Sequence, residues 1–175
     1  VCTNYWIYSV RYILNGGKNS RLNPITYQIV TPTLKLYAPT RKGYEFTGWY
    51  KEKSKVNKIS KISKGSKGNL HLYAEWEKIS VNQIKKVKIS KVKKKKFTVS
   101  FKKLNKKPQY EISVSTNKKF KKKATKTYTV TKNSFTVKKC KKKTKYYVRI
   151  RGIRVDSTGE KIYGEHSTVK TVVTK

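Results

Sequence analysis

The chain has few of the side chains that carry out catalysis. Its 175 residues include no Met, two Cys, two His, one Asp and seven Glu. Catalytic and metal sites need such groups within hydrogen-bond reach of one another. His71 points away from the apolar face of its expected strand, and the neighbours Glu165 and His166 point to opposite faces of theirs. We therefore predict that this chain is not an enzyme and holds no metal and no cofactor.

Long apolar segments and paired cysteines are also missing. No run of 18 or more apolar residues occurs, which predicts that no helix spans a membrane. Cys2 and Cys140 lie far apart, and neither belongs to a CxxC motif or lies near a histidine, so we expect no disulfide between them. The chain begins at Val1 without a charged and apolar leader. We interpret it as a monomeric internal or mature segment of a longer multidomain protein.

Acidic residues are scarce, whereas lysine is abundant. Lys and Arg number 45 against 8 Asp and Glu, which gives a net charge of +37. Residues 1–80 contribute +10 of this charge and residues 81–175 contribute +27. A field of this strength attracts any polyanion, with an affinity that falls as salt rises. The alternative is that the lysines form a solvated, solubilising surface without a dedicated partner.

Arginine is also rare, since only six of the 45 basic residues are Arg. Bidentate reading of guanine and of phosphate geometry favours the planar arginine fork over lysine. Aromatic rings beside a basic groove stack on single-stranded bases. Here Tyr44, Phe46, Trp49 and Trp76 occupy apolar positions of the first half, whereas the lysines cluster in the second half. We therefore expect no specific nucleic-acid partner.

Alternation of apolar and polar residues predicts strands in the first half. The segment 8–14 alternates and runs into Asn15-Gly16-Gly17, which we interpret as a turn because neither a helix nor a GK[ST] motif follows. Residues 54–68 are rich in Lys, Ser and Gly and are expected to form a loop with at most one helical turn. Further strands are expected at residues 26–30, 33–37, 44–50 and 69–76.

The second half shows short strands separated by lysine runs. Residues 78–84 carry no strong pattern, so we place a domain boundary there and predict domains at residues 1–80 and 81–175. Strands are then expected at residues 97–101, 110–114, 125–130, 134–137 and 146–155, and within 161–173. Six or seven short strands without helical periodicity predict a β-sandwich. The fold class of the whole chain is therefore mainly β.

Four motifs follow one another in the first half. They are YILNGG (12–17), Pro24 with Tyr27, L-x-x-P-x-R-K-G-Y-x-F-x-G-W-Y (36–50) and KGSKGNLHLYAEW (64–76). In this order they resemble the Listeria-Bacteroides repeat, a small β-grasp-like module of bacterial surface proteins. The resemblance implies structural roles in that module for the aromatic residues Tyr44, Phe46, Trp49 and Trp76.

The second half carries the motifs YEISVS (110–115) and CKKKTKYYVRIR (140–151), preceded by Phe101. These resemble a lysine-rich fibronectin type III domain of the kind found on bacterial surface proteins. The resemblance implies that Phe101 replaces a core Trp and that Cys140 is a small buried residue in a Leu position. It also makes Tyr146 the corner tyrosine, whose hydroxyl group bonds back to the backbone.

The sandwich topology gathers many lysines at one end. Each strand crosses a sandwich once, so alternate connections lie at the same end. The connections around residues 93–96, 118–123 and 138–143 therefore bring fourteen lysines together, and we name this set the lysine pole. Its members are Lys93, Lys94, Lys95, Lys96, Lys118, Lys119, Lys121, Lys122, Lys123, Lys138, Lys139, Lys141, Lys142 and Lys143.

The opposite end of the sandwich is expected to carry fewer lysines, together with the two acidic residues of the loop 156–160. Its basic residues are Lys102, Lys103, Lys106, Lys107 and Lys132. The resulting field is dipolar, and crowded like charges destabilise a fold unless counterions or an anionic polymer neutralise them. Our hypothesis is that the lysine pole binds an anionic cell-wall polymer such as a teichoic acid, an acidic polysaccharide or a lipid headgroup surface.

These features favour a non-catalytic segment of a secreted or cell-surface bacterial protein that acts as a stalk or adhesion module. The expected location is extracellular, at the cell surface or in the cell wall. One alternative is a module that binds carbohydrate or a host ligand through exposed members of the set Trp6, Tyr8, Tyr50 and Tyr73. Another is a non-catalytic C-terminal region of a larger secreted enzyme.

Overall fold

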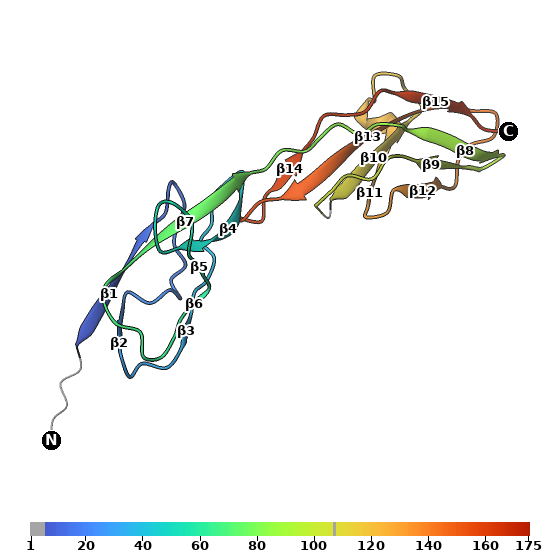
Figure 1. The fold of residues 1–175 in the computed structure, drawn as a ribbon. Coiled ribbons are helices and arrows are strands. Elements are labelled where there is room, and N and C mark those ends of the chain that lie inside the picture. The colour runs from blue at the N-terminus through green and yellow to red at the C-terminus, as the bar shows by residue number, and fades with distance from the viewer. Residues whose placement is uncertain (1–5, 107) are drawn as a thin grey trace. The chain divides into compact units, whose positions relative to one another are not determined.

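The computed structural model describes residues 6–106 and 108–175, which form two compact units (Figure 1). Unit 1 contains the described residues up to Ile79 together with the segment Val155–Glu160. Unit 2 contains Ser80–Arg154 and Lys161–Lys175. Unit 1 ends at Ile79 and unit 2 begins at Ser80, within the segment 78–84 in which the sequence shows no strong pattern. The short segment Val155–Glu160 belongs to unit 1.

Unit 1 is built around one mixed sheet. Its strands are β1 (Ile7–Ile13), β2 (Thr26–Gln28), β3 (Leu34–Lys35), β4 (Tyr44–Tyr50), β5 (Lys58–Ile59), β6 (Lys61–Ile62) and β7 (Leu70–Lys78). Five of them form a sheet in the order β2-β1-β7-β4-β5, and β3 pairs with β6 in a separate ladder. β1 and β7 run parallel at the centre, whereas the other pairs are antiparallel. This arrangement confirms the predicted β-grasp-like module.

The prediction of a loop over residues 54–68 was wrong in part. β5 and β6 lie within this segment, and the described residues of unit 1 contain no helical turn. Trp49 of β4 lies opposite Ile59 of β5, and Leu34 of β3 lies opposite Ile62 of β6. Strands of two residues show no periodicity in the sequence, because they depend on partners elsewhere in the chain.

Aromatic rings form the core of unit 1. The side chains of Trp49 and Leu72 are almost completely buried, and Phe46 and Trp76 pack against them. The ring centroid of Phe46 lies 5.3 Å from that of Trp49 and 5.5 Å from that of Trp76, both in edge-to-face geometry. Tyr44, at the first residue of β4, lies outside this cluster. Three of the four rings assigned a structural role thus pack together in and against the core of unit 1.

The turn after β1 is shaped by close packing against Trp76. Asn15 and Gly16 have φ angles of 47° and 86°, as the predicted turn requires. A Cβ atom at Gly17 would overlap the indole ring of Trp76, whose Nε1 donates a hydrogen bond to the Leu14 carbonyl at 2.9 Å. Only glycine fits at position 17 without displacing the ring.

Unit 2 is a sandwich of two sheets. Its strands are β8 (Lys88–Lys93), β9 (Lys96–Ser100), β10 (Gln109–Ser115), β11 (Thr125–Val130), β12 (Ser134–Val137), β13 (Lys145–Val155), β14 (Lys161–Tyr163) and β15 (Lys170–Val173). One sheet has the order β12-β9-β8, and the other has the order β11-β10-β13-β14, with β15 also paired to β13. A single 3-10 turn, η1 (Lys122–Ala124), precedes β11. This order confirms the predicted fibronectin type III-like sandwich.

The last strand differs from the prediction because it is interrupted. The expected strand within residues 161–173 consists of β14 and β15, separated by an irregular segment that crosses close to another backbone. A Cβ atom at Gly164 would lie 2.8 Å from the Val81 carbonyl oxygen. The chain therefore leaves the regular ladder after β14 and joins it again at β15.

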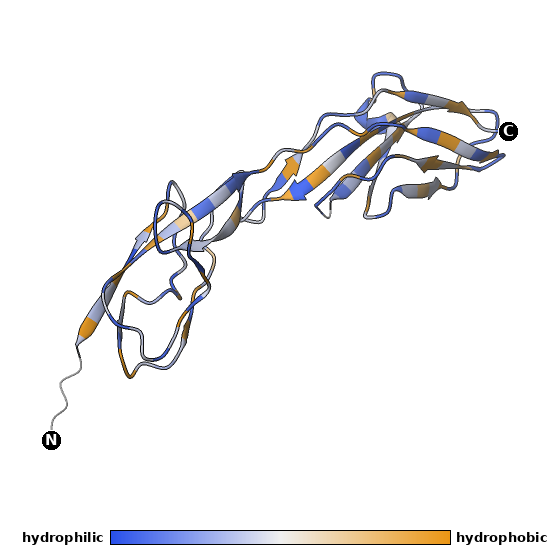
Figure 2. Cartoon of the chain, viewed as in Figure 1, coloured by the Kyte–Doolittle hydropathy of each residue, from blue (hydrophilic) through white to orange (hydrophobic). Residues whose placement is uncertain are grey.

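The core of unit 2 lies between its two sheets. Phe97, Tyr110 and Ile150 are fully buried, and the ring of Phe101 packs edge-to-face on Tyr110 at a centroid distance of 4.7 Å. Cys140 is also buried in this core, as expected for a residue in a Leu position. Along the strands of Figure 2, hydrophobic residues alternate with hydrophilic ones. No helix in the described ranges is long and apolar enough to cross a membrane.

Candidate polyanion-binding site

The register of the first sheet places two lysine-rich connections at the same end. Lys93, the last residue of β8, lies opposite Lys96, the first residue of β9. Val137, the last residue of β12, lies opposite Phe97. The β8–β9 turn and the β12–β13 loop therefore emerge side by side.

The register of the second sheet brings the third connection to this end. Ser115, the last residue of β10, lies opposite Thr125 of β11 and Tyr147 of β13. The β10–β11 connection thus begins where β13 begins, directly after the β12–β13 loop. All fourteen residues of the lysine pole lie in or beside these three connections, and all are exposed.

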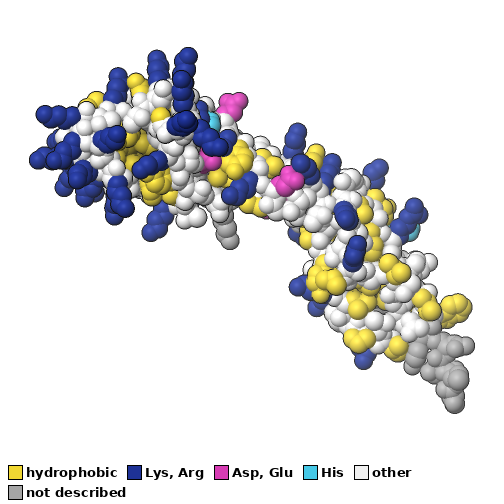
Figure 3. Space-filling view, turned by 180° about the vertical axis from the view of Figure 1, so that it is seen from behind, with side chains coloured by type: hydrophobic (Ala, Val, Ile, Leu, Met, Phe, Trp, Pro, Cys, Tyr) yellow, Lys and Arg dark blue, Asp and Glu magenta, His cyan; other side chains and the backbone are white. Residues whose placement is uncertain are grey.

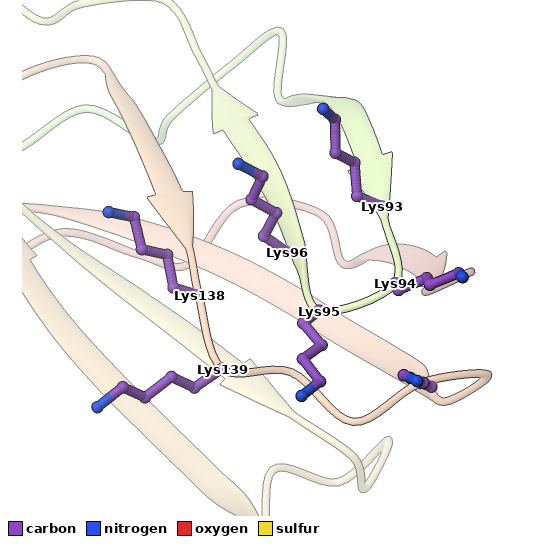
Figure 4. A pocket seen from close by; sticks show the side chains of 7 residues that line it. Lys93, Lys94, Lys95, Lys96, Lys138 and Lys139 are labelled. Atoms are coloured by element: carbon purple, nitrogen blue, oxygen red, sulfur yellow. The ribbon is translucent and has the colours of Figure 1, made fainter.

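A shallow cup opens between the β8–β9 turn and the β12–β13 loop, with a volume of about 650 Å³. It is lined by Lys93, Lys94, Lys95, Lys96, Lys138, Lys139 and Lys142. Figure 4 shows their side chains spreading outward from the two connections, with the amino groups well separated from one another. The walls are the aliphatic parts of these side chains, so the cup presents apolar stems capped by charges.

Hydrogen bonds hold the backbone that carries the cup. The Cys140 amide donates to the Lys95 carbonyl at 3.0 Å, which ties the two connections together. The Tyr146 hydroxyl accepts a hydrogen bond from the Lys141 amide at 2.8 Å. The Thr174 hydroxyl donates to the Lys141 carbonyl at 2.6 Å. The predicted corner role of Tyr146 is thus observed in the geometry of this loop.

The lysine pole contains no neutralising acid. Unit 2 holds thirty-one Lys or Arg but only Glu111 and Glu165 as acids. Within the described ranges, no residue of the lysine pole forms an ion pair. Figure 3 shows dark-blue side chains crowded at the end of unit 2 and no magenta among them on this face. Lysines placed opposite each other, such as Lys93 and Lys96, repel and destabilise the sheet.

Two lysines of the pole have unfavourable backbone conformations. Lys139 and Lys143 have φ angles of 58° and 44°, in the left-handed region that glycine and asparagine adopt more easily. Both lie in the β12–β13 loop beside the cup. The loop therefore places charged side chains at positions where a small neutral residue would be more stable.

The residues considered for catalysis are not brought together. His71 is exposed, and Cys140 is buried, with its thiol pKa raised by that burial. Burial lowers the pKa of His166, and the nearby charges of Arg149 and Arg151 lower it further. No group of three or more His, Cys, Asp or Glu able to hold a metal occurs in the part of the chain that the structure describes. Cys2 lies outside the described residues, as does Lys107 of the opposite end.

The aromatic residues considered for ligand stacking are scattered. Trp6 is 80% exposed, whereas the ring of Tyr8 packs on Tyr27 at a centroid distance of 5.4 Å. Tyr50 and Tyr73 lie opposite each other on β4 and β7 and are half-buried. The four candidates therefore offer one fully exposed ring and one cross-strand pair.

The sequence did not single out a second charged cluster, around Arg149 and Arg151 on β13. The guanidinium groups of these residues stack on Phe120 and Tyr163, respectively. One signal was available: two of only six arginines alternate along one strand, which places them on the same face. The aromatic partners come from the β10–β11 connection and from β14, and they carry no sequence signature.

Comparison with known families identifies unit 1. Residues 8–75 match the Listeria-Bacteroides repeat domain, which confirms the resemblance seen in the motifs. No curated protein matches the chain by sequence. Repeat modules of this kind are typical of extracellular or surface proteins and are generally non-catalytic.

Several fibronectin type III domains of known structure are similar to part of the chain. The FN5 domain of Drosophila Lar is 20% identical, with 54% of this chain and 97% of that one covered and a TM-score of 0.43. The fn3 domain of human contactin 1 is 16% identical, with 55% and 78% covered and a TM-score of 0.45. A domain of human fibronectin type III domain containing protein 3 is 15% identical, with 56% and 89% covered and a TM-score of 0.44.

Proposed function

We propose that the lysine pole of unit 2 binds an anionic polymer of the cell wall or an acidic glycan by electrostatic attraction. In this proposal the chain is a non-catalytic stalk or adhesion segment of a secreted or cell-surface bacterial protein. One observation carries the proposal: three connections distant in sequence bring fourteen exposed lysines to one end without an acidic neighbour.

The energetic argument is that the crowded charges destabilise unit 2 when no anion is present. Opposed lysines repel, and the left-handed backbone of Lys139 and Lys143 adds strain. A polymer with regularly spaced phosphates or carboxylates removes this repulsion and releases counterions. The open cup suits a flexible chain because it contacts the polymer through mobile side chains and imposes no rigid outline.

The test compares two triple variants of the full chain with equal loss of charge. Lys138→Gln, Lys139→Gln and Lys142→Gln remove charges from the cup. Lys102→Gln, Lys103→Gln and Lys132→Gln remove three from the opposite end of unit 2. Binding to a purified teichoic acid and to a polyuronate is measured by calorimetry from low to high salt.

We expect the cup variant to bind more weakly and with a smaller salt dependence than the control. Each lost contact lowers the slope of log K against log salt by about 0.7, so the cup variant should lose up to about 2 in slope. An affinity that does not depend on salt would contradict the proposal. Equal weakening in both variants would instead show that the lysines act as a general solubilising surface.

A further inference from the structure

The outer face of the second sheet of unit 2 carries charged residues outside the lysine pole. Arg149 and Arg151 of β13 lie opposite Ser113 and Glu111 of β10. Side chains alternate along a strand, and Ile150 points into the core, so both arginines project from the outer face. We name Arg149, Arg151, Glu111, Phe120 and His166 the Arg149 cluster.

The two arginines of this cluster differ in their charge balance. Arg151 donates through Nε to Glu111 Oε1 at 2.7 Å, and the pair is largely shielded from solvent. Arg149 forms no ion pair with any described residue, and its Nε is buried without a hydrogen-bond partner. Buried N–H groups are normally paired. Arg149 therefore carries an uncompensated positive charge at a site where a charge partner is expected.

An aromatic ring fixes the orientation of this guanidinium group. The guanidinium carbon of Arg149 lies 4.2 Å from the ring centroid of Phe120. Phe120 has a φ of 53°, which is rare for a bulky residue, and its amide donates to the Asn117 carbonyl at 2.9 Å. Strained backbone often accompanies functional sites. The ring also keeps water from one face of the guanidinium, which strengthens its attraction for an anion.

The rest of the cluster determines what kind of anion fits. Burial and the two arginines keep His166 neutral at pH 7, and its Nε2 is buried without a partner. The charges of Arg151 and Glu111 cancel, so the cluster has a net charge of about +1. A single charge matches one carboxylate, and the arginine fork binds a carboxylate through two parallel hydrogen bonds.

One exposed hydroxyl group, that of Thr127, lies in the same row of the sheet as this charge. Ser113 lies opposite Arg149 on one side and opposite Thr127 of β11 on the other, so the three residues form one row across the sheet. Serine and threonine hydroxyls both donate and accept hydrogen bonds, as sugar hydroxyls do. Ser113 is buried, so the row offers a ligand the guanidinium and the exposed hydroxyl of Thr127, which suits a sugar that carries one carboxylate.

We propose that the Arg149 cluster binds a uronate residue of an acidic glycan. The carboxylate pairs with the guanidinium of Arg149, and a ring hydroxyl contacts the exposed Thr127. This site adjoins the lysine pole, because Phe120 lies between Lys119 and Lys121, but the pole attracts polymers by total charge. The Arg149 cluster adds selectivity for a sugar carboxylate, and single uronate units bind there.

The test is an NMR titration of the isotope-labelled full chain with glucuronate. A single carboxylate contact at a partly exposed site gives millimolar affinity, so the sugar is added up to about 20 mM. We expect saturable shifts of the Arg149 Nε and His166 ring signals. We also expect the pKa of His166 to rise, because the bound carboxylate offsets the charge of Arg149. Glucose should cause no shift, and acetate should bind several-fold more weakly because it lacks the hydroxyls.

Three variants connect the binding to the named groups. Arg149→Lys keeps the charge but loses the planar fork, and should weaken glucuronate binding by about tenfold. Thr127→Val alters an exposed residue, which preserves the fold, and should weaken it several-fold. Lys138→Gln with Lys139→Gln should leave glucuronate binding unchanged, whatever its effect on polymers. The absence of saturable shifts, or unchanged affinity in Arg149→Lys, would overturn the proposal. Equal binding of acetate and glucuronate would overturn the assignment to a sugar.

Discussion

Replacing Lys139 or Lys143 by glycine should stabilise unit 2 while it weakens polymer binding. Their φ angles of 58° and 44° lie in the left-handed region, which disfavours an L side chain by about 1 to 2 kcal/mol. Glycine removes this strain but loses about 0.5 to 1 kcal/mol through its greater freedom in the unfolded chain. The net gain is between about 0 and 1.5 kcal/mol per site, before any relief of repulsion among the lysines.

The assay must report on unit 2 alone. All three tryptophans lie in unit 1, so their fluorescence follows that unit during unfolding. Amide hydrogen exchange of the buried residues Val148 and Ile150 follows unit 2, because β13 is central in its sheet. Slower exchange in the glycine variants, together with weaker polymer binding, is the expected result.

Two control variants separate the backbone effect from the charge effect. Lys86→Gly relieves a similar φ of 56° outside the lysine pole, so it should stabilise unit 2 and leave polymer binding intact. Lys142→Gly removes a charge of the cup at a position without a positive φ, so it should weaken binding without stabilising the fold. If Lys139→Gly and Lys143→Gly destabilise unit 2 as much as Lys142→Gly does, the reasoning from backbone strain is refuted.

Three further predictions concern single contacts. Tyr146→Phe removes a hydroxyl that accepts a backbone hydrogen bond and should destabilise unit 2 by about 1 kcal/mol, measured by amide exchange in β13; unchanged exchange would contradict this. Gly17→Ala forces the ring of Trp76 to move and should destabilise unit 1 by about 1 to 3 kcal/mol. Urea unfolding followed by tryptophan fluorescence measures this change, and an unchanged unfolding midpoint would show that the turn accepts the methyl group without cost. Burial raises the pKa of Asp156, but hydrogen bonds to its carboxylate, including one from the Gly43 amide, outweigh this and lower the pKa to about 2. The stabilisation from Asp156 is therefore complete above about pH 4 and is lost as the pH falls through 2, and a carboxyl NMR titration with a midpoint near 4 would refute it.

Most of the β architecture could be predicted from the sequence. Strands with clear alternation were located to within about two residues, because one buried face repeats every second position. Two of the strands that were missed, β5 and β6, are two residues long and exist through pairing with β4 and β3. The third, β8, was missed because its sequence KISKVK is rich in lysine. The split between β14 and β15 was also missed, because the close approach of Val81 to Gly164 is a tertiary contact.

The candidate sites also include one feature that the sequence could predict and one that depends on tertiary contacts. The lysine pole was predicted from connection order alone, because sandwich topology decides which loops share an end. The Arg149 cluster could not be predicted, because Phe120 and His166 reach β13 from separate loops whose conformation depends on packing. The motif assigned Tyr44 a structural role but did not show that its ring stacks on the guanidinium of Arg41 outside the core.

The sequence by itself determined that the chain is mainly β, that two different modules follow one another, and that its charge is strongly positive. These properties depend on local periodicity, motif order and composition, which do not require contacts between distant residues. Only the tertiary structure decided which lysines form a cup, and that one arginine of unit 2 lies beneath an aromatic ring without a charge partner. Those features depend on loop conformation and strand register, which pairing across the sheets determines.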